Sequence, residues 1–279
     1  MKNAFILLVL IGCLAELPLY GQFYHPDKKE YQTPDQYGLI YESIYFESTD
    51  KTKLHGWFVP SRNQSLGTVI YFHGNAQNLS AHFSFVKWLP NQGFNIFLFD
   101  YRGYGKSEGT PTRTGVHQDA VSALQYIKTR KDIDQDKLLV LGQSLGGAVA
   151  ISVVGSTNIS GICGMAVEST FDSYKAIAKE KAPSILADMF VSDGLSPDAV
   201  ISNVYPVPTV FIHGTSDRVV PYRRGKALFE LAKKPKAMWT IQGGRHTEAF
   251  TKYGKKYRPR LVAYFKKCVE RNKELNKAD

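Results

Sequence analysis

Short apolar runs alternate along the chain with segments of helical periodicity. The runs predict strands, because strands covered by helices on both sides need no polar face. Strands are predicted at residues 39–46, 54–60, 68–74, 94–100, 137–143, 161–169, 208–214 and 237–242. Helices are predicted at residues 78–89, 115–130, 223–232 and 258–275.

This alternation predicts an α/β fold. A turn-like segment, "ESTDKT", separates the first two strands, so we expect them to pair antiparallel. Strands that alternate with helices form βαβ units, which build a parallel sheet with helices on both faces. We therefore expect a mostly parallel sheet of about eight strands. Functional residues should follow strands, because sites in such sheets lie at the carboxyl ends.

Residues 170–206 interrupt the alternation. They have helical patches without a clear strand, and we interpret them as a short helical cap inserted into the main domain. An apolar group in this segment could line a pocket for an acyl chain, or could simply pack a short helix onto the domain. The group comprises Ile185, Leu186, Met189, Phe190 and Val191.

The sequence "GQSLG" at 142–146 matches G-x-S-x-G, which places a serine on a sharp strand-to-helix turn. A predicted strand precedes it, and small residues follow it. Ser144 is therefore the candidate nucleophile. A serine hydroxyl needs a base that removes its proton, and the base needs an acid that orients it.

The acid and the base are expected after later strands, in the order serine, acid, histidine. Asp217 follows the strand at 208–214, and His246 lies in a glycine-flanked loop after the last strand. Glu168 also follows a strand, but Asp217 has the better position. His73 and His213 precede glycines at strand ends and are interpreted as residues that shape the site.

Stabilisation of the reaction's oxyanion needs N–H donors that are already in place. One is expected from Leu145, directly after the serine. The other is expected from the loop "HGNAQN", from Asn75 or alternatively Ala76. Asp100 and Arg102, in the turn "DYRGYGKSEG", are interpreted as structural.

With these motifs the chain resembles the α/β-hydrolase superfamily. More narrowly, it resembles bacterial serine hydrolases related to the abhydrolase-domain palmitoyl-protein thioesterases. The segments that carry the resemblance are "YFHGNAQN", "FDYRGYGKSEGTP", "GQSLGG", "HGTSDRVVP" and "GGRH". The resemblance implies an α/β-hydrolase fold and a Ser-His-Asp triad, but says little about the substrate.

The first residues differ from the rest. "MK" precedes a brief apolar run that ends at Cys13, the layout of a signal peptide. The segment "LIGC" resembles the lipobox of bacterial lipoproteins, which implies cleavage before Cys13 and lipidation of its thiol. The alternative is an uncleaved anchor helix. We expect a signal peptide at 1–12, a tether at 13–34 and the hydrolase domain at 35–279, located at a bacterial cell envelope and membrane-tethered.

Composition adds few constraints. The net charge of +10 is interpreted as a solvated helix face, because much of it lies in the C-terminal segment. A weak attraction to anionic membranes is the alternative, and no nucleic-acid motif accompanies the charge. Cys163 and Cys268 are expected to be buried, and no Cys/His cluster has the spacing of a structural zinc site. No cofactor and no metal are expected.

The sequence therefore predicts a serine hydrolase that cleaves carboxylic esters or thioesters of acyl or lipid-like substrates through an acyl-enzyme. A peptidase or amidase on the same fold is one alternative. A non-catalytic binding protein on a hydrolase scaffold is another, because a fold alone does not establish activity.

Overall fold

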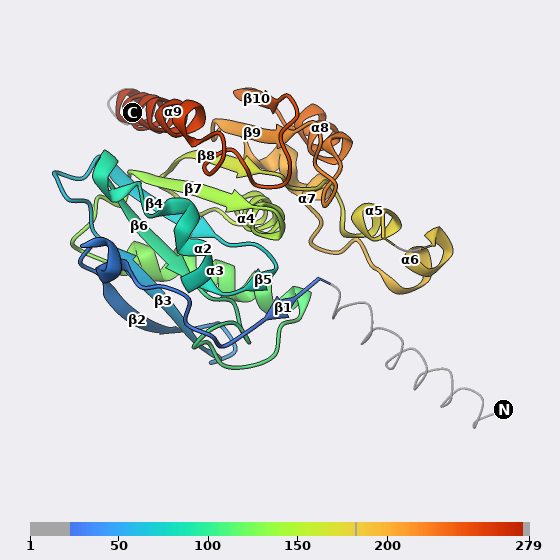
Figure 1. Ribbon diagram of the computed structural model, residues 1–279, viewed down its shortest axis with the longest axis horizontal. Coiled ribbons are helices and arrows are strands. Elements are labelled where there is room, and N and C mark those ends of the chain that lie inside the picture. Colours follow the sequence, from blue (N-terminus) through green and yellow to red (C-terminus); the bar gives the residue numbers. More distant parts are fainter. Residues whose placement is uncertain (1–22, 182, 276–279) are drawn as a thin grey trace.

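An eight-stranded sheet forms the centre of the computed structural model, which describes residues 23–181 and 183–275 (Figure 1). The strand order is β10-β9-β8-β7-β4-β6-β3-β2. The strands of this sheet are β2 (Glu42–Glu47), β3 (Lys53–Val59), β4 (Gly67–Phe72), β6 (Phe94–Phe99), β7 (Leu138–Gln143), β8 (Ile162–Glu168), β9 (Thr209–Gly214) and β10 (Lys236–Ile241).

The pairing directions confirm the predicted topology. β2 pairs antiparallel with β3, and β3 pairs antiparallel with β6. All other neighbours in this sheet are parallel. The carboxyl ends of β4, β7, β8, β9 and β10 therefore lie at one edge, and the loops that follow them meet there.

Two hydrophobic cores cover the two faces of the sheet. In β4, Val69 and Tyr71 belong to one core, and Ile70 and Phe72 belong to the other. Successive side chains of a strand point to opposite faces, which explains the continuous apolar run. Residues of α2 and α9 contribute to the first core, and residues of α3, α4 and α8 to the second. The helices are α2 (Leu79–Val86), α3 (Arg113–Thr129), α4 (Leu145–Ser156), α8 (Tyr222–Leu231) and α9 (Gly254–Leu275), with short 3-10 turns η1 (Pro34–Tyr37) and η2 (Pro90–Gln92).

The segment expected to form a cap consists of short helices. They are α5 (Tyr174–Lys179), α6 (Ser184–Phe190), α7 (Pro197–Val200) and the 3-10 turn η3 (Ile201–Val204). In Figure 1, α5 and α6 extend away from the sheet. Arg113 of α3 ties this segment down, because its Nη1 donates to the carbonyl oxygens of Ser192 and Gly194.

The segment just after residue 22 packs on the domain. β1 (His25–Pro26) pairs parallel with β5 (Ala76–Gln77), and Tyr24 is 5% exposed. The expected tether at 13–34 is thus too long at its C-terminal end, since backbone hydrogen bonds and side-chain burial fix residues from 23 onward. The signal peptide expected at 1–12 and the lipidated Cys13 lie outside the described residues.

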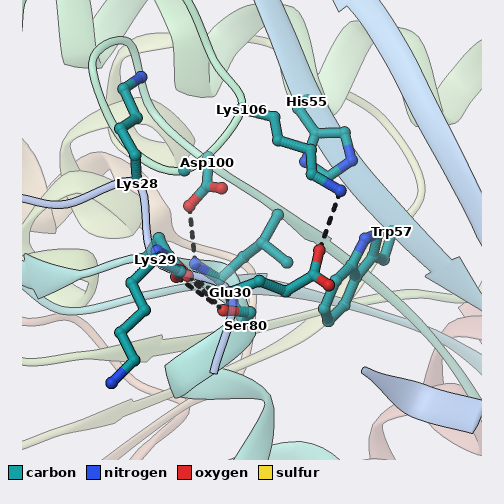
Figure 2. Close-up of a pocket in the computed structure, with 11 residues that line it drawn as sticks. Lys28, Lys29, Glu30, His55, Trp57, Ser80, Asp100 and Lys106 are labelled. Carbon is teal, nitrogen blue, oxygen red and sulfur yellow. Dashed lines mark hydrogen bonds and ion pairs between the residues drawn. The ribbon is translucent and has the colours of Figure 1, made fainter. Parts of the chain in front are cut away.

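Figure 2 shows how the segment after β1 is held. Lys106 Nζ forms an ion pair with Glu30 at 2.9 Å, and the Lys29 carbonyl lies 3.5 Å from the Ser80 hydroxyl. These residues line a cavity with a volume of about 20 Å³, and the buried Asp100 also lines it. These contacts extend the packing of the N-terminal segment beyond β1.

The turn after β6 is structural, as the sequence suggested. Arg102 is 8% exposed and forms ion pairs with Asp119 and Asp50, both at 2.8 Å. Its backbone N–H also donates to Asp119. Arg102 therefore fastens the turn to α3.

Candidate active site

Ser144 is the single residue between β7 and α4. Its backbone has a conformation that residues with a side chain rarely adopt. Its φ is 51° and its ψ is −120°, and its N–H donates to the Glu168 carbonyl at 2.8 Å. A Cβ at Gly146 would lie 2.1 Å from the Phe72 carbonyl oxygen, and one at Gly142 would lie 2.7 Å from that of Gly146. The two glycines are therefore required by the close approach of backbones at the turn.

Ser144, His246 and Asp217 form one chain of hydrogen bonds. His246 Nε2 lies 3.0 Å from Ser144 Oγ, and His246 Nδ1 lies 2.8 Å from Asp217 Oδ2. A carboxylate can only accept, so Nδ1 carries the proton in the neutral ring, and Nε2 accepts from the serine hydroxyl. This arrangement allows proton transfer from Ser144 to His246.

Asp217 is 6% exposed and lies in the loop after β9. Burial alone would raise the pKa of its carboxyl, but hydrogen bonds with His213 and His246 outweigh burial and hold that pKa well below its usual range. Its Oδ1 also accepts from the N–H groups of Val219 and Val220, each at 2.9 Å. The carboxylate is therefore kept ionised and fixed in direction.

Glu168, the other acid considered, bonds elsewhere. Its carboxylate accepts from Gln143 Nε2 and from the Ala249 N–H, both at 2.7 Å. Burial is the main cause of the raised pKa of this carboxyl. Ala249 lies in the loop that carries His246, so Glu168 anchors that loop, and Asp217 is the acid beside the imidazole.

Two backbone N–H groups are available near Ser144. Asn75 follows β4, Leu145 begins α4, and both residues line one cavity with Ser144. Within the described residues, neither N–H has a hydrogen-bond partner. His73 Nδ1 donates to the Gly74 carbonyl at 2.7 Å, which fixes the peptide plane that carries the Asn75 N–H. Both N–H groups are therefore candidate donors for an oxyanion hole.

The cavity at Ser144, here called the Ser144 cavity, has a volume of about 110 Å³ and a mostly apolar wall. Lys181 is the charged residue among those that line it. The lining residues are Phe23, Asn75, Ser144, Leu145, Phe171, Ile177, Ala178, Lys181, Val219 and Val220.

The cap contributes to this cavity through Ile177 and Ala178 of α5. Ile185 is 67% exposed, Leu186 is exposed, and Val191 is buried in the core. None of these three is among the residues that line the cavity. Val191 fits the alternative of packing onto the domain, whereas Ile185 and Leu186 fit neither alternative, because both are exposed. The side chains of Met189 and Phe190 lie outside the described part of the structure.

A second cavity, here called the His246 cavity, has a volume of about 580 Å³ and a polar wall. It meets the Ser144 cavity at Val219, which lines both. The residues that line it are Ser216, Arg218, Val219, Gly243, Arg245, His246 and Glu248.

Several lining residues escaped sequence reasoning. Phe23 was assigned to the tether, although the apolar pair Phe23–Tyr24 could have indicated burial. Val219 and Val220 lie two and three residues after Asp217, and an apolar pair in a polar loop is a comparable signal. Arg218 and Arg245 carried no signal, because exposed arginines are common throughout the chain.

Residues 23–181 and 183–275 contain neither a candidate metal site nor a candidate membrane span. No group of histidine, cysteine or acidic residues there could hold a metal ion. No helix among them has both the length and the apolar character to cross a bilayer.

Comparison with known proteins places this geometry in a family. Residues 63–193 match the family described as "Serine aminopeptidase, S33". The uncharacterized protein YfhR of Escherichia coli K12 is 39% identical over 270 residues, with 94% of this chain and 93% of YfhR covered. Among solved structures, the Pyrococcus furiosus esterase Pf2001 is similar in fold, with a TM-score of 0.72 at 22% identity over 88% of this chain and 98% of that one.

One plant relative is named as an α/β-hydrolase-domain protein. The alpha/beta hydrolase domain-containing protein WAV2 of Arabidopsis thaliana is 30% identical over 262 residues, with 87% of this chain and 84% of WAV2 covered. The sheet order, the turn at Ser144 and this similarity agree. The chain therefore belongs to the α/β-hydrolase family.

Proposed function

We propose that this protein is a serine hydrolase that cleaves carboxylic esters or thioesters through an acyl-enzyme. The observation that carries the proposal is the hydrogen-bonded chain of Ser144, His246 and Asp217 beside an apolar cavity. Two N–H groups that line this cavity have no partner among the described residues. Membership of the α/β-hydrolase family supports a hydrolase in general. The geometry of the three residues supports hydrolysis through an acyl-enzyme on Ser144.

In the proposed mechanism, Ser144 Oγ attacks the carbonyl carbon while His246 Nε2 takes the hydroxyl proton. The carbonyl oxygen becomes an oxyanion and accepts hydrogen bonds from the N–H groups of Asn75 and Leu145. The bond to the leaving group then breaks, and the proton passes from His246 to the leaving oxygen or sulfur. Water repeats these steps on the acyl-serine and releases the acid.

The wall of the Ser144 cavity favours acyl substrates over those of an aminopeptidase. An aminopeptidase must hold a substrate ammonium close to the scissile bond, which requires acidic or carbonyl partners. The charged residue that lines this cavity, Lys181, would repel an ammonium. A panel of aminoacyl amides and short acyl esters tests whether acyl esters are the better substrates. Faster turnover of the amides would favour the aminopeptidase.

The first experiment is labelling with a fluorescent fluorophosphonate, which reacts with activated serines. We expect the wild type to label and Ser144→Ala to lose labelling, with ester hydrolysis reduced by at least about 10³-fold. Ser156→Ala is the matched control. Ser156 Oγ lies 3.2 Å from His117 Nε2, so it also forms a serine–histidine pair, but outside the site. Absence of labelling in the wild type would favour a binding protein.

We also propose that lipid on Cys13 tethers the protein to a bacterial envelope. The supporting observations are the signal-like start of the sequence and the lipobox-like "LIGC". Intact mass of the membrane-extracted protein should show an acylated chain that begins at Cys13. A mass that includes Met1 would support an uncleaved anchor instead.

A further inference from the structure

The two cavities differ in which of the proposed catalytic groups they contain. The Ser144 cavity is lined by Ser144, Asn75 and Leu145, and the His246 cavity is lined by His246. In the proposed mechanism, His246 Nε2 delivers a proton to the leaving atom. The leaving group must therefore lie on the His246 side while the acyl chain occupies the apolar side.

The His246 cavity carries excess positive charge. Arg218 and Arg245 line it together with one acid, Glu248. Glu248 Oε2 already accepts from the Arg245 backbone N–H at 2.8 Å and lies 3.7 Å from Lys252 Nζ. In the described part of the chain, neither arginine side chain has an ion pair or hydrogen bond. Both guanidinium groups are thus free to bind an anion.

We propose that the His246 cavity binds an anionic leaving group, a phosphate-bearing alcohol or thiol, through Arg218 and Arg245. This inference rests on the proposed function. Guanidinium groups bind phosphate oxygens at two points and remain charged at every physiological pH, so they suit such a group. The substrate is then an acyl ester or thioester whose leaving group carries phosphate.

The test compares matched substrates that differ only in phosphate. One pair is butanoylglycerol and butanoylglycerol phosphate, which represents a lipid headgroup. The other pair is the butanoyl thioesters of N-acetylcysteamine and coenzyme A, which represents a phosphate-bearing thiol. We expect kcat/KM to be about tenfold higher for the phosphate-bearing member of at least one pair. The pair that shows the preference identifies the source.

Arg218→Gln combined with Arg245→Gln should lower kcat/KM for the phosphate-bearing substrate by about tenfold. The kcat/KM for the neutral member of the same pair should change little. Lys255→Gln combined with Lys266→Gln, on the exposed side of α9, is the control for net charge. Equal or slower turnover of the phosphate-bearing members, in protein whose Ser144 still labels, would overturn the inference. Loss of labelling would instead reject the proposed function.

A separate observation concerns the N-terminal segment. The Asn75 carbonyl accepts two hydrogen bonds, from the His25 N–H at 2.8 Å and from the Tyr104 hydroxyl at 2.7 Å. The Asp27 N–H donates to the Gln77 carbonyl at 3.1 Å. β1 therefore holds the loop that supplies one of the proposed oxyanion donors, and Phe23 forms part of the cavity wall.

We infer that residues 23–27 are a positioning element of the site and not only a connection to an anchor. The matched pair His25→Pro and His25→Ala isolates the backbone contribution, because only proline removes the N–H. We expect His25→Pro to lower kcat for a short ester by about tenfold with little change in KM, and His25→Ala to lower kcat by much less. Tyr104→Phe, which removes the other donor, should also lower kcat.

If His25→Pro does not fold, Tyr104→Phe still tests whether hydrogen bonds to the Asn75 carbonyl matter, and Phe23→Ala tests the segment itself. Equal kcat for wild type, Tyr104→Phe and both His25 variants would overturn the inference. Phe23→Ala adds a second readout, the preference for acyl-chain length. We expect it to shift preference toward longer acyl chains, and an unchanged chain-length profile would contradict a wall role for Phe23.

Discussion

At the scale of single residues, the site depends on the backbone as much as on side chains. Ser144 has a positive φ, a conformation that is costly for a residue with a Cβ. The hydrogen bond from its N–H to the Glu168 carbonyl and the absence of side chains at Gly142 and Gly146 hold it there. This explains why a short glycine-framed motif could indicate the position of the serine from sequence alone.

The lowered pKa of Asp217 has a consequence for stability at acidic pH. A carboxyl whose folded pKa lies below its unfolded value stabilises the fold above the unfolded pKa, about 3.9 for Asp, and loses that contribution as pH falls through the folded pKa. We expect wild type to have a larger free energy of unfolding than Asp217→Asn at neutral pH. This difference should shrink as pH falls below about 4. Urea denaturation at several pH values measures this difference, and a constant difference would contradict it.

At the scale of elements, the cap depends on a few contacts with the main domain. Arg113 reaches from α3 to the Ser192 and Gly194 carbonyls, and its guanidinium lies 4.1 Å from the centre of the Tyr174 ring. α5 carries Ile177 and Ala178 of the Ser144 cavity. Through these contacts Arg113 links α3 to one wall of that cavity.

Removal of the Arg113 contacts should therefore loosen the cap. We expect Arg113→Gln to speed tryptic cleavage after Lys179 and Lys181 by about tenfold and to raise KM for ester substrates. Lys128→Gln, at the other end of α3, is the control and should match wild type. Unchanged cleavage in Arg113→Gln would show that other contacts hold the cap.

The central sheet was predictable because its strands carry a strong signal. Apolar runs such as residues 68–74 are buried on both faces, so composition alone marks them. β1 and β5 have two residues each and no apolar pattern, and only tertiary contacts create them. The candidate triad positions followed from order along the chain, whereas the cavity walls come from segments far apart in sequence, such as Phe23 and Val219. Their meeting depends on three-dimensional packing.

At the scale of the whole molecule, the core to which α2 and α9 contribute isolates two thiols, those of Cys163 and Cys268, from solvent. Cys163 and Cys268 are 2% and 3% exposed, and within residues 23–181 and 183–275 neither forms a disulfide. Burial is the main cause of their raised pKa values, about 12 for Cys163 and about 11 for Cys268. Both thiols are therefore protonated at neutral pH and shielded from reagents.

We expect neither Cys163 nor Cys268 to react with iodoacetamide in the folded protein at pH 8, because the thiolate is the reactive form. Both should react once urea unfolds the chain. Peptide mass mapping before and after unfolding measures each cysteine separately. Rapid modification of either one in the folded state would indicate that the packing around α9 opens readily.

The strand order also has a consequence for synthesis of the chain. Ser144 and the histidine beside it are 102 residues apart, and that histidine follows β10, which joins the edge of the sheet. A ribosome-bound chain that has completed only the first two thirds of its length holds the serine without its partner. Such a nascent chain should be chemically silent, and reactivity should first arise when the final strand emerges and docks.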